Sequence, residues 1–256
     1  MRNVLAIARK EIRGYFVSPI GWVILGLFAL LFGFFYYAFL GLFVRQSLQM
    51  SQFGGGPQAM NVNLYMIRPL LQNTSVIVLF VLPMVTMRTY AEEKRSGTIE
   101  LLLTSPVTDL QIILGKFFGA LALYASMLLV TAVYISLLFW FGNPEVGPIL
   151  SGYLGLLLLG GGFIAVGLLV SSLTKNQIVA AMATFGTFLM LWVIGWVGDF
   201  AGPTTRSIVS YLSITEHFDD FSKGVIDTKH LMYYLSFITF GLFLTSKAVD
   251  SERWRG

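Results

Sequence analysis

The sequence predicts an all-α membrane protein with six transmembrane helices, and three observations support this. Hydrophobic residues make up 56% of the 256 positions and charged residues only 12%, and the mean hydropathy is +0.76. Uncharged stretches close to the roughly 20 residues that a helix needs to cross a bilayer recur along the chain. Basic residues gather in alternate connecting segments, as in polytopic membrane proteins. A soluble domain is excluded.

The expected transmembrane domain covers residues 20–246. Its six spans are 20–44, 69–87, 117–141, 149–173, 178–197 and 231–246. The second contains Pro83, which lacks a backbone N–H and is expected to kink the helix. None of the six contains Asp, Glu, Lys, Arg or His.

Orientation follows from the basic residues, which are retained on the cytoplasmic side. With both termini in the cytoplasm, all but five of the 17 Lys and Arg residues lie inside; the five are Arg45, Arg68, Arg206, Lys223 and Lys229. The net charge of +4 therefore reflects topology, and no nucleic-acid partner is expected. The chain has no cysteine, which excludes disulfides and thiol chemistry but says nothing about compartment.

Residues 1–19 have the pattern of an amphipathic helix in the cytoplasmic interface. Apolar residues fall on one side (Val4, Leu5, Ala8, Ile12, Tyr15) and basic residues on the other (Arg2, Arg9, Arg13, with Lys10 nearby). Glu11 lies among the apolar residues. It either snorkels or pairs locally with Lys10 or Arg13, or it forms a salt bridge to a cytoplasmic loop or partner.

The cytoplasmic loop 88–116 is unusually structured. Residues 88–95 mix both charges, Gly97 interrupts them, 98–104 favours a short helix, and Pro106 ends it. Thr108 and Gln111 form a capping box that starts the helix of the third span. The apolar ridge 99–103 among so many charges indicates a surface that contacts a partner.

The last outer segment, 198–230, predicts two short helices before the sixth span, at 203–212 and 214–223. A capping box at 213–216 starts the second helix and Gly224 suits its end. Ile214, Phe218 and Phe221 share one face. We expect the two helices to enter the outer leaflet in part, with Phe218 and Phe221 in lipid or against the sixth span.

The polar residues of that helix allow two interpretations. Glu216, His217, Asp219 and Asp220 could form a metal or acid–base site. One histidine without an evident orienting partner is weak support for a metal, so we expect a solvated polar face with His217 and Asp220 at the water side.

No phosphate-binding loop is present. The glycine clusters 54–56 and 160–162 are not followed by Lys-Ser or Lys-Thr, and Gly115-Lys116 is followed by Phe117. Energy for any transport must then come from outside this chain, and the uncharged spans disfavour an ion-coupled carrier.

The chain resembles the membrane subunit of type-2 ATP-binding-cassette exporters over nearly all of its length. The resemblance rests on RKEIRGYF at 9–16, EEKRSGTIE at 92–100 with Ser105-Pro106 after it, six spans, and paired outer helices. Residues 211–228, YLSITEHFDDFSKGVIDT, look like the outer motif of permeases for gliding motility and nitrous-oxide-reductase maturation.

The resemblance implies a half-transporter in a bacterial cytoplasmic (inner) membrane, paired with an identical or paralogous subunit. A separate cassette ATPase would bind ATP and Mg, so this chain is expected to be no enzyme and to hold no cofactor. The coupling segment would dock on that ATPase through Glu92, Glu93, Lys94, Arg95, Ile99, Glu100 and Leu102. Residues 247–256 would form a cytoplasmic tail, and the outer hairpin would present Glu216, His217, Phe218 and Phe221.

Three other functions stay open on the residues alone: an ion-coupled secondary carrier, an outer-face enzyme using His217, and a membrane anchor without a transport cycle. Gly115 and Gly119, spaced as GxxxG, allow close helix contact either within the subunit or between two subunits.

Overall fold

The computed structural model describes residues 2–52, 60–103, 106–200, 206, 209 and 211–253. Its elements in these residues are all helical, and six helices are long and apolar enough to cross a membrane. The predicted all-α membrane fold is confirmed. The first outer helix, expected at 203–212, lies almost wholly outside the described residues.

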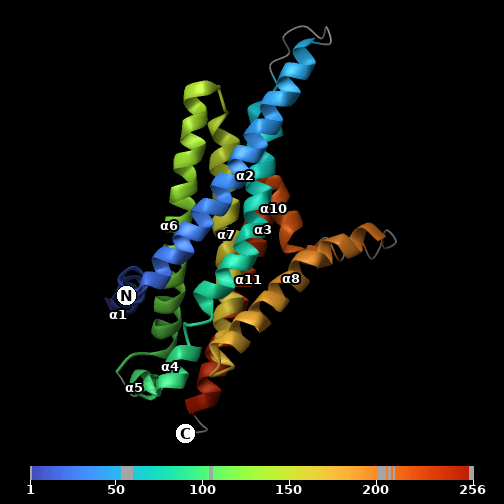
Figure 1. Cartoon of the computed structure of the whole chain (residues 1–256). Helices are drawn as coiled ribbons and strands as arrows, with labels where there is room; N and C mark the ends of the chain where they lie inside the picture. The colour runs from blue at the N-terminus through green and yellow to red at the C-terminus, as the bar shows by residue number, and fades with distance from the viewer. Residues whose placement is uncertain are drawn as a thin grey trace.

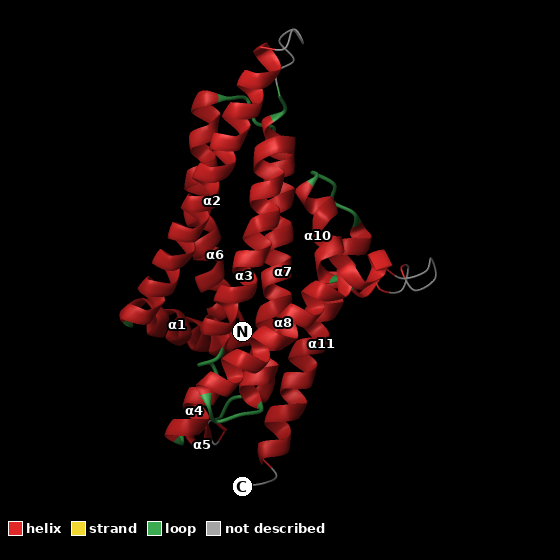
Figure 2. Ribbon diagram, turned by 45° about the vertical axis from the view of Figure 1, so that its right-hand side comes forward, coloured by secondary structure: helices red, strands yellow, loops and turns green. Residues whose placement is uncertain are grey.

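Seven long helices and three short ones make up the described chain (Figures 1 and 2). The long helices are α1 (Arg2–Val17), α2 (Pro19–Gln52), α3 (Arg68–Thr86), α6 (Asp109–Phe141), α7 (Val146–Ser172), α8 (Gln177–Phe200) and α11 (Thr228–Arg253). The short helices are α4 (Ala91–Ser96), α5 (Thr98–Leu103) and α10 (Ile214–Ser222), and a π-helical turn, Asn63–Ile67, leads into α3.

The six expected spans fall one each on α2, α3, α6, α7, α8 and α11, and their ends differ from the helix ends by at most eight residues. α2, α6, α8 and α11 extend beyond the uncharged stretches, so these helices continue past the apolar segments into flanking polar residues. α3 runs through Pro83 as one continuous helix.

α7 is the central helix of the bundle and packs against α3, α6, α8, α10 and α11. Its glycines make this possible. A Cβ on Gly160 would lie 2.1 Å from the ring of Tyr124 on α6, and one on Gly167 would lie 2.3 Å from Thr86 on α3. In a membrane the hydrophobic effect does not drive helices together, because lipid tails are equally apolar. Small residues instead let the helix backbones approach closely and pack.

α1 lies across the end of the bundle that also carries α4, α5 and the C-terminus (Figure 1). It rests on α6 because two glycines leave room for it: a Cβ on Gly115 would lie 2.6 Å from Ile7, and one on Gly119 would lie 2.5 Å from Glu11. The GxxxG pair is therefore used within the subunit.

The orientation of α1 about its axis corrects the sequence analysis at one residue. Ala8 is buried, and Val4, Ile12 and Tyr15 are partly buried, so the apolar side faces the protein. Leu5 was expected on that side but is 70% exposed. At 100° per residue it lies at the border of the apolar stripe, and the bundle covers the other side of that stripe.

Candidate functional site

The segment between α3 and α6 contains the short helices α4 and α5, which lie at the end of the bundle near α1 (Figure 2). Gly97 joins them with a φ of 71°, a left-handed conformation that glycine adopts without a steric cost. Thr108 and Gln111 form the predicted capping box at the start of α6. The helix break and the capping box are thus confirmed.

A buried lysine ties this segment to the bundle. Lys116, on α6, is 1% exposed. Its Nζ lies 3.0 Å from Oε1 of Glu11 on α1 and 2.9 Å from Oε1 of Glu93 on α4. It also donates a hydrogen bond of 2.8 Å to the carbonyl of Thr89, and it lies 5.0 Å from the centre of the Tyr90 ring.

We call Lys10, Glu11, Glu93 and Lys116 the Lys116 cluster. Lys10 completes it from the solvent side, 3.3 Å from Oε1 of Glu93. The cluster has two positive and two negative charges and is therefore neutral. A buried charge is tolerated when it is paired and hydrogen-bonded, as Lys116 is here. The cluster joins α1, α4 and α6 at one point. Of the two interpretations of Glu11, the salt bridge to another segment is therefore confirmed, and the local pair with Lys10 or Arg13 is not.

A serine at the end of α7 holds the start of α4. The Ser171 hydroxyl accepts hydrogen bonds of 3.1 Å from the N–H groups of Tyr90 and Ala91, and donates one of 3.1 Å to the carbonyl of Met87. These N–H groups are among those that a helix N-terminus leaves without an intrahelical partner. Lys94 in turn donates to the carbonyl of Ser172. The coupling segment is thus fixed to α7 as well as to α1 and α6.

Two residues predicted to face an ATPase point into the protein instead. Glu93 belongs to the Lys116 cluster and Lys94 is 7% exposed. α4 presents the Glu93–Lys94 side to the bundle, and a helix that packs on its neighbours must turn one side inward.

The opposite side of the segment faces outward. Glu92, Arg95 and Glu100 are exposed, and Glu92 pairs with Arg88 at 2.9 Å. Ile99 is partly buried against the core. The side chain of Leu102 lies outside the described residues, while Leu101 is 73% exposed.

Sequence reasoning missed Lys116 and Ser171 as contributors to this site, whereas Leu101 belongs to the apolar ridge 99–103 that was expected to contact a partner. The pairing of Lys116 could have been predicted. A lysine at the start of a membrane-spanning helix has few possible partners, and Glu11 was an acidic residue among apolar ones with no assigned partner. Nothing in the sequence singled out Ser171.

At the flank of α7, α10 packs into the bundle. Ser213 caps it by accepting from the N–H of Glu216 at 3.4 Å, which is half of the predicted capping box, and Gly224 ends it with a φ of 94°. Phe218 and Phe221 are 2% and 0% exposed and lie against Gly155 of α7. Of the two positions expected for these side chains, lipid is wrong, because the glycine leaves a recess in α7 that holds them. The expected contact with the sixth span is found for Phe221, whose ring centre lies 6.2 Å from that of Tyr234 on α11.

His217 is also buried, at 3% exposure, so the expected solvated position is wrong. Its ring stacks on Tyr233 at 3.8 Å between centroids. Its Nδ1 lies 2.6 Å from Nδ1 of His230, and its Nε2 lies 3.0 Å from the carbonyl of Tyr211. His230, thirteen residues away, supplies the contact that the sequence did not show.

The hydrogen bond to the Tyr211 carbonyl shows which ring nitrogen of His217 carries the proton. The Tyr211 carbonyl only accepts, so His217 carries its proton on Nε2 and accepts at Nδ1. Nδ1 of His230 then donates to His217, and Nε2 of His230 lies 2.9 Å from Oδ2 of Asp220. This arrangement fits a neutral His217. Burial lowers the pKa of His217, with His230 contributing further, although the carbonyl of Tyr211 opposes the shift.

These residues give no metal geometry. Two histidine nitrogens 2.6 Å apart leave no room for an ion at about 2.0 Å from each in an open angle. Within the described residues, no group of three or more His, Asp or Glu side chains is placed to hold an ion.

Asp219 anchors α10 to α3. Its Oδ1 accepts from Arg68 at 2.9 Å and from Gln72 at 2.8 Å, and its Oδ2 lies 2.6 Å from Lys223. Burial alone would raise the pKa of Asp219, but the hydrogen bonds from Lys223 and Arg68 outweigh it, so the pKa is lowered. Glu216, by contrast, is exposed.

The fold and this site define a polytopic helical membrane protein with a rigidly anchored helical segment at one end. Residues 5–249 match the ABC-2 family transporter protein family, and the chain belongs to it. It is also 28% identical over 145 residues to the "Probable multidrug ABC transporter permease YbhR" of Escherichia coli strain K12 and to that of Escherichia coli O157:H7. That match covers 55% of this chain and 38% of each relative.

Proposed function

We propose that this chain is the transmembrane subunit of an ATP-driven exporter, which forms the translocation path with a second copy or a paralogue and is driven by a separate cassette ATPase. Membership of the ABC-2 transporter family supports the transport role. The observation that carries the coupling role is the outward face of α4 and α5, where Glu92, Arg95, Glu100 and Leu101 are exposed.

The anchoring of this face supports a mechanical role. A push on α4 acts on α1 and α6 through the Lys116 cluster and on α7 through Ser171. A loop that only connected α3 and α6 would not need three separate attachments. A solvent-exposed leucine among charges is typical of a surface that binds a partner.

The proposed membrane is the cytoplasmic membrane of a bacterium, with both termini and the α4–α5 segment in the cytoplasm. The distribution of Lys and Arg supports this orientation, and the curated relatives are from Escherichia coli. ATP and Mg would be bound by the ATPase, because this sequence has no phosphate-binding loop.

Two observations bear on the cargo. Residues 211–228 resemble the outer motif of gliding-motility and nitrous-oxide-reductase-maturation permeases, and we propose that subgroup for this chain. The relatives from Escherichia coli are named as probable multidrug permeases. Stimulation of ATP hydrolysis by candidate compounds, measured on the assembled transporter, distinguishes the two.

The test is to co-express and co-purify the chain with a candidate cassette ATPase from the same organism, and to replace Leu101 by Asp. We expect the Leu101→Asp variant to lose the complex and the stimulated hydrolysis while still inserting in the membrane. Leu173→Asp is the matched control, because Leu173 is 69% exposed at the end of α7.

An unchanged complex in Leu101→Asp, or an equal loss in both variants, would contradict the docking assignment. If the wild-type complex forms but shows neither stimulated hydrolysis nor transport, the result would favour the alternative function, a membrane anchor without a transport cycle.

A further inference from the structure

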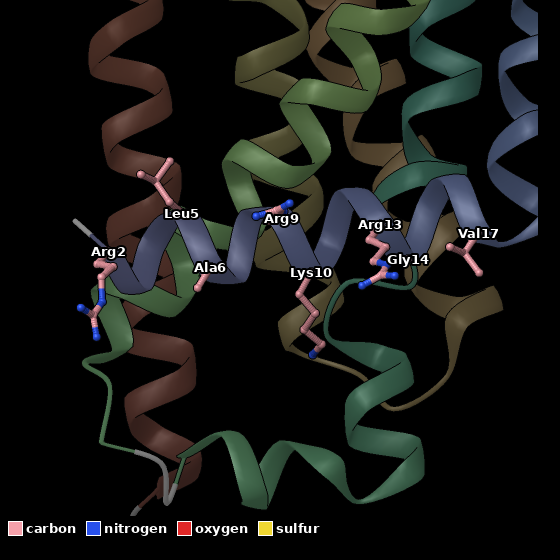
Figure 3. Close-up of a pocket in the computed structure, with 8 residues that line it drawn as sticks. All are labelled: Arg2, Leu5, Ala6, Arg9, Lys10, Arg13, Gly14 and Val17. Atoms are coloured by element: carbon pink, nitrogen blue, oxygen red, sulfur yellow. The ribbon is translucent and has the colours of Figure 1, made fainter.

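The outward face of α1 carries three arginines in a row. Arg2, Arg9 and Arg13 are all exposed and line the same open recess of about 700 Å³ (Figure 3). Arg9 and Arg13 are one helical turn apart, and Arg2 lies about two turns before Arg9. Ala6, between Arg2 and Arg9, and Gly14, directly after Arg13, also line the recess, and the space around Gly14 is open.

These arginines differ from the other basic residues near them. Lys10, Arg88 and Lys116 each pair with a glutamate. In the part of the chain that the structure describes, no acidic side chain lies within salt-bridge distance of Arg2, Arg9 or Arg13. A row of cations without internal partners is available to an external anion.

Apolar side chains border the same row. Leu5 and Val17 line the recess and are 70% and 75% exposed. Trp22, at the start of α2, is 57% exposed, and its indole N–H donates to the carbonyl of Phe16 at 2.9 Å. Tryptophan is enriched at the level of lipid head groups, so Trp22 indicates that this surface lies at head-group depth.

We propose that this face of α1 binds the head groups of anionic phospholipids. The guanidinium groups would hold the phosphates through paired N–H donors, and Leu5 and Val17 would contact the first carbons of the acyl chains. Because the apolar side of α1 is already covered by the bundle, α1 is held to the membrane surface by this basic face, and its fixed position on α6 sets where the lipid binds. The inference requires a membrane protein only and does not depend on the proposed transport cycle.

A docking protein is the other candidate occupant, and charge favours lipid. The α4–α5 segment presents both signs of charge, as expected of a protein interface, whereas the recess on α1 is lined by basic, apolar and small residues without a carboxylate. A surface of that composition matches an anionic leaflet, where each nearby Lys or Arg adds attraction.

The test measures lipid retained by the full chain in detergent. Native mass spectrometry would be used to titrate phosphatidylglycerol and phosphatidylcholine with the same acyl chains. We expect the wild type to prefer phosphatidylglycerol, and the triple variant Arg2→Gln, Arg9→Gln, Arg13→Gln to lose at least about tenfold in apparent affinity for it. The matching triple lysine variant keeps the charge but loses the paired donors, so its affinity should fall between those of the wild type and the glutamine variant.

A second triple variant controls for net charge. Arg45→Gln, Lys175→Gln and Lys229→Gln remove the same three charges from other exposed positions. Equal loss in this control, or unchanged phosphatidylglycerol binding in the α1 variant, would overturn the proposal. Unchanged lipid binding together with loss of the cassette ATPase would assign the face to a protein instead. The melting temperature should stay the same in both variants, since all six side chains are exposed.

Discussion

Replacing Lys116 by Met should destabilise the protein and loosen the α4–α5 segment. The side chain is 1% exposed and holds two carboxylates, at 3.0 and 2.9 Å. Removing one partner of a buried ion pair costs about 3–5 kcal/mol, because the other charge remains buried. Lys10 still contacts Glu93 at 3.3 Å and reduces this loss, so the lower end of the range is expected. Most of the lost free energy of unfolding then comes from the carboxylate of Glu11, which is left without a partner.

The loss can be measured as a melting temperature in detergent. For a chain of this size, 1 kcal/mol corresponds to roughly 2–4 °C, so the expected decrease is roughly 6–12 °C. Trypsin cleavage after the exposed Arg95 reports on the segment itself and should become faster. Lys175→Met, at an exposed position, is the control and should change neither quantity.

A combined variant tests the electrostatic reasoning. Lys116→Met together with Glu11→Gln and Glu93→Gln removes all three charges and should recover most of the lost stability, because no buried charge is then unpaired. A Lys116→Met protein that melts within about 2 °C of the wild type would refute the reasoning. A triple variant as unstable as the single one would assign the role of the lysine to packing.

Three further predictions concern other parts of the bundle. Ser171→Ala should cost about 1–2 kcal/mol, since it uncaps α4, whereas Ser172→Ala, whose hydroxyl bonds within α7, should cost less; equal melting temperatures would contradict the cap. Gly160→Ala should cost about 1–3 kcal/mol by overpacking, and Gly26→Ala, which has open space around it, should be tolerated; equal tolerance at both sites would contradict the close α6–α7 contact. Because burial lowers the pKa of His217 in the fold, its contribution to stability is full above pH about 6.5 and is lost as the pH falls toward the folded value. The melting temperature should therefore drop between pH 7.5 and 5.5 in the wild type and drop less in His217→Gln; parallel pH curves would contradict the buried, neutral histidine.

The spans and caps could be predicted because their causes are local. An uncharged stretch of about 20 residues is a helix in a membrane whatever its neighbours are, and Gly97 and Thr108 act on the backbone beside them. The partners of charged residues were not local. Glu11 and Lys116 are 105 positions apart, and only the packing of α1 on α6 brings them together.

Apolar surfaces were predicted, but not what covers them. An apolar helix side fits a lipid chain and a neighbouring helix about equally well, since both are hydrocarbon. The sequence therefore could not tell that α1 turns its apolar side to α6, or that Phe218 and Phe221 pack in the recess at Gly155. His217 was misplaced for the same reason, because its burial follows from the docking of α10 and from His230.

The position of α7 connects the two regions that carry polar contacts. At one end, Ser171 holds the start of α4; at the other, Ser151 donates to the carbonyl of Phe221 at the end of α10, at 2.7 Å. Close-packed helices shift as rigid bodies between discrete arrangements rather than deforming continuously. A displacement of the α4–α5 segment by a partner would therefore reach α10 through α7, without any change inside the spans themselves. The glycines that seat Tyr124 and Thr86 against α7 make that connection stiff, which is why the Gly160→Ala variant should affect transport as well as stability.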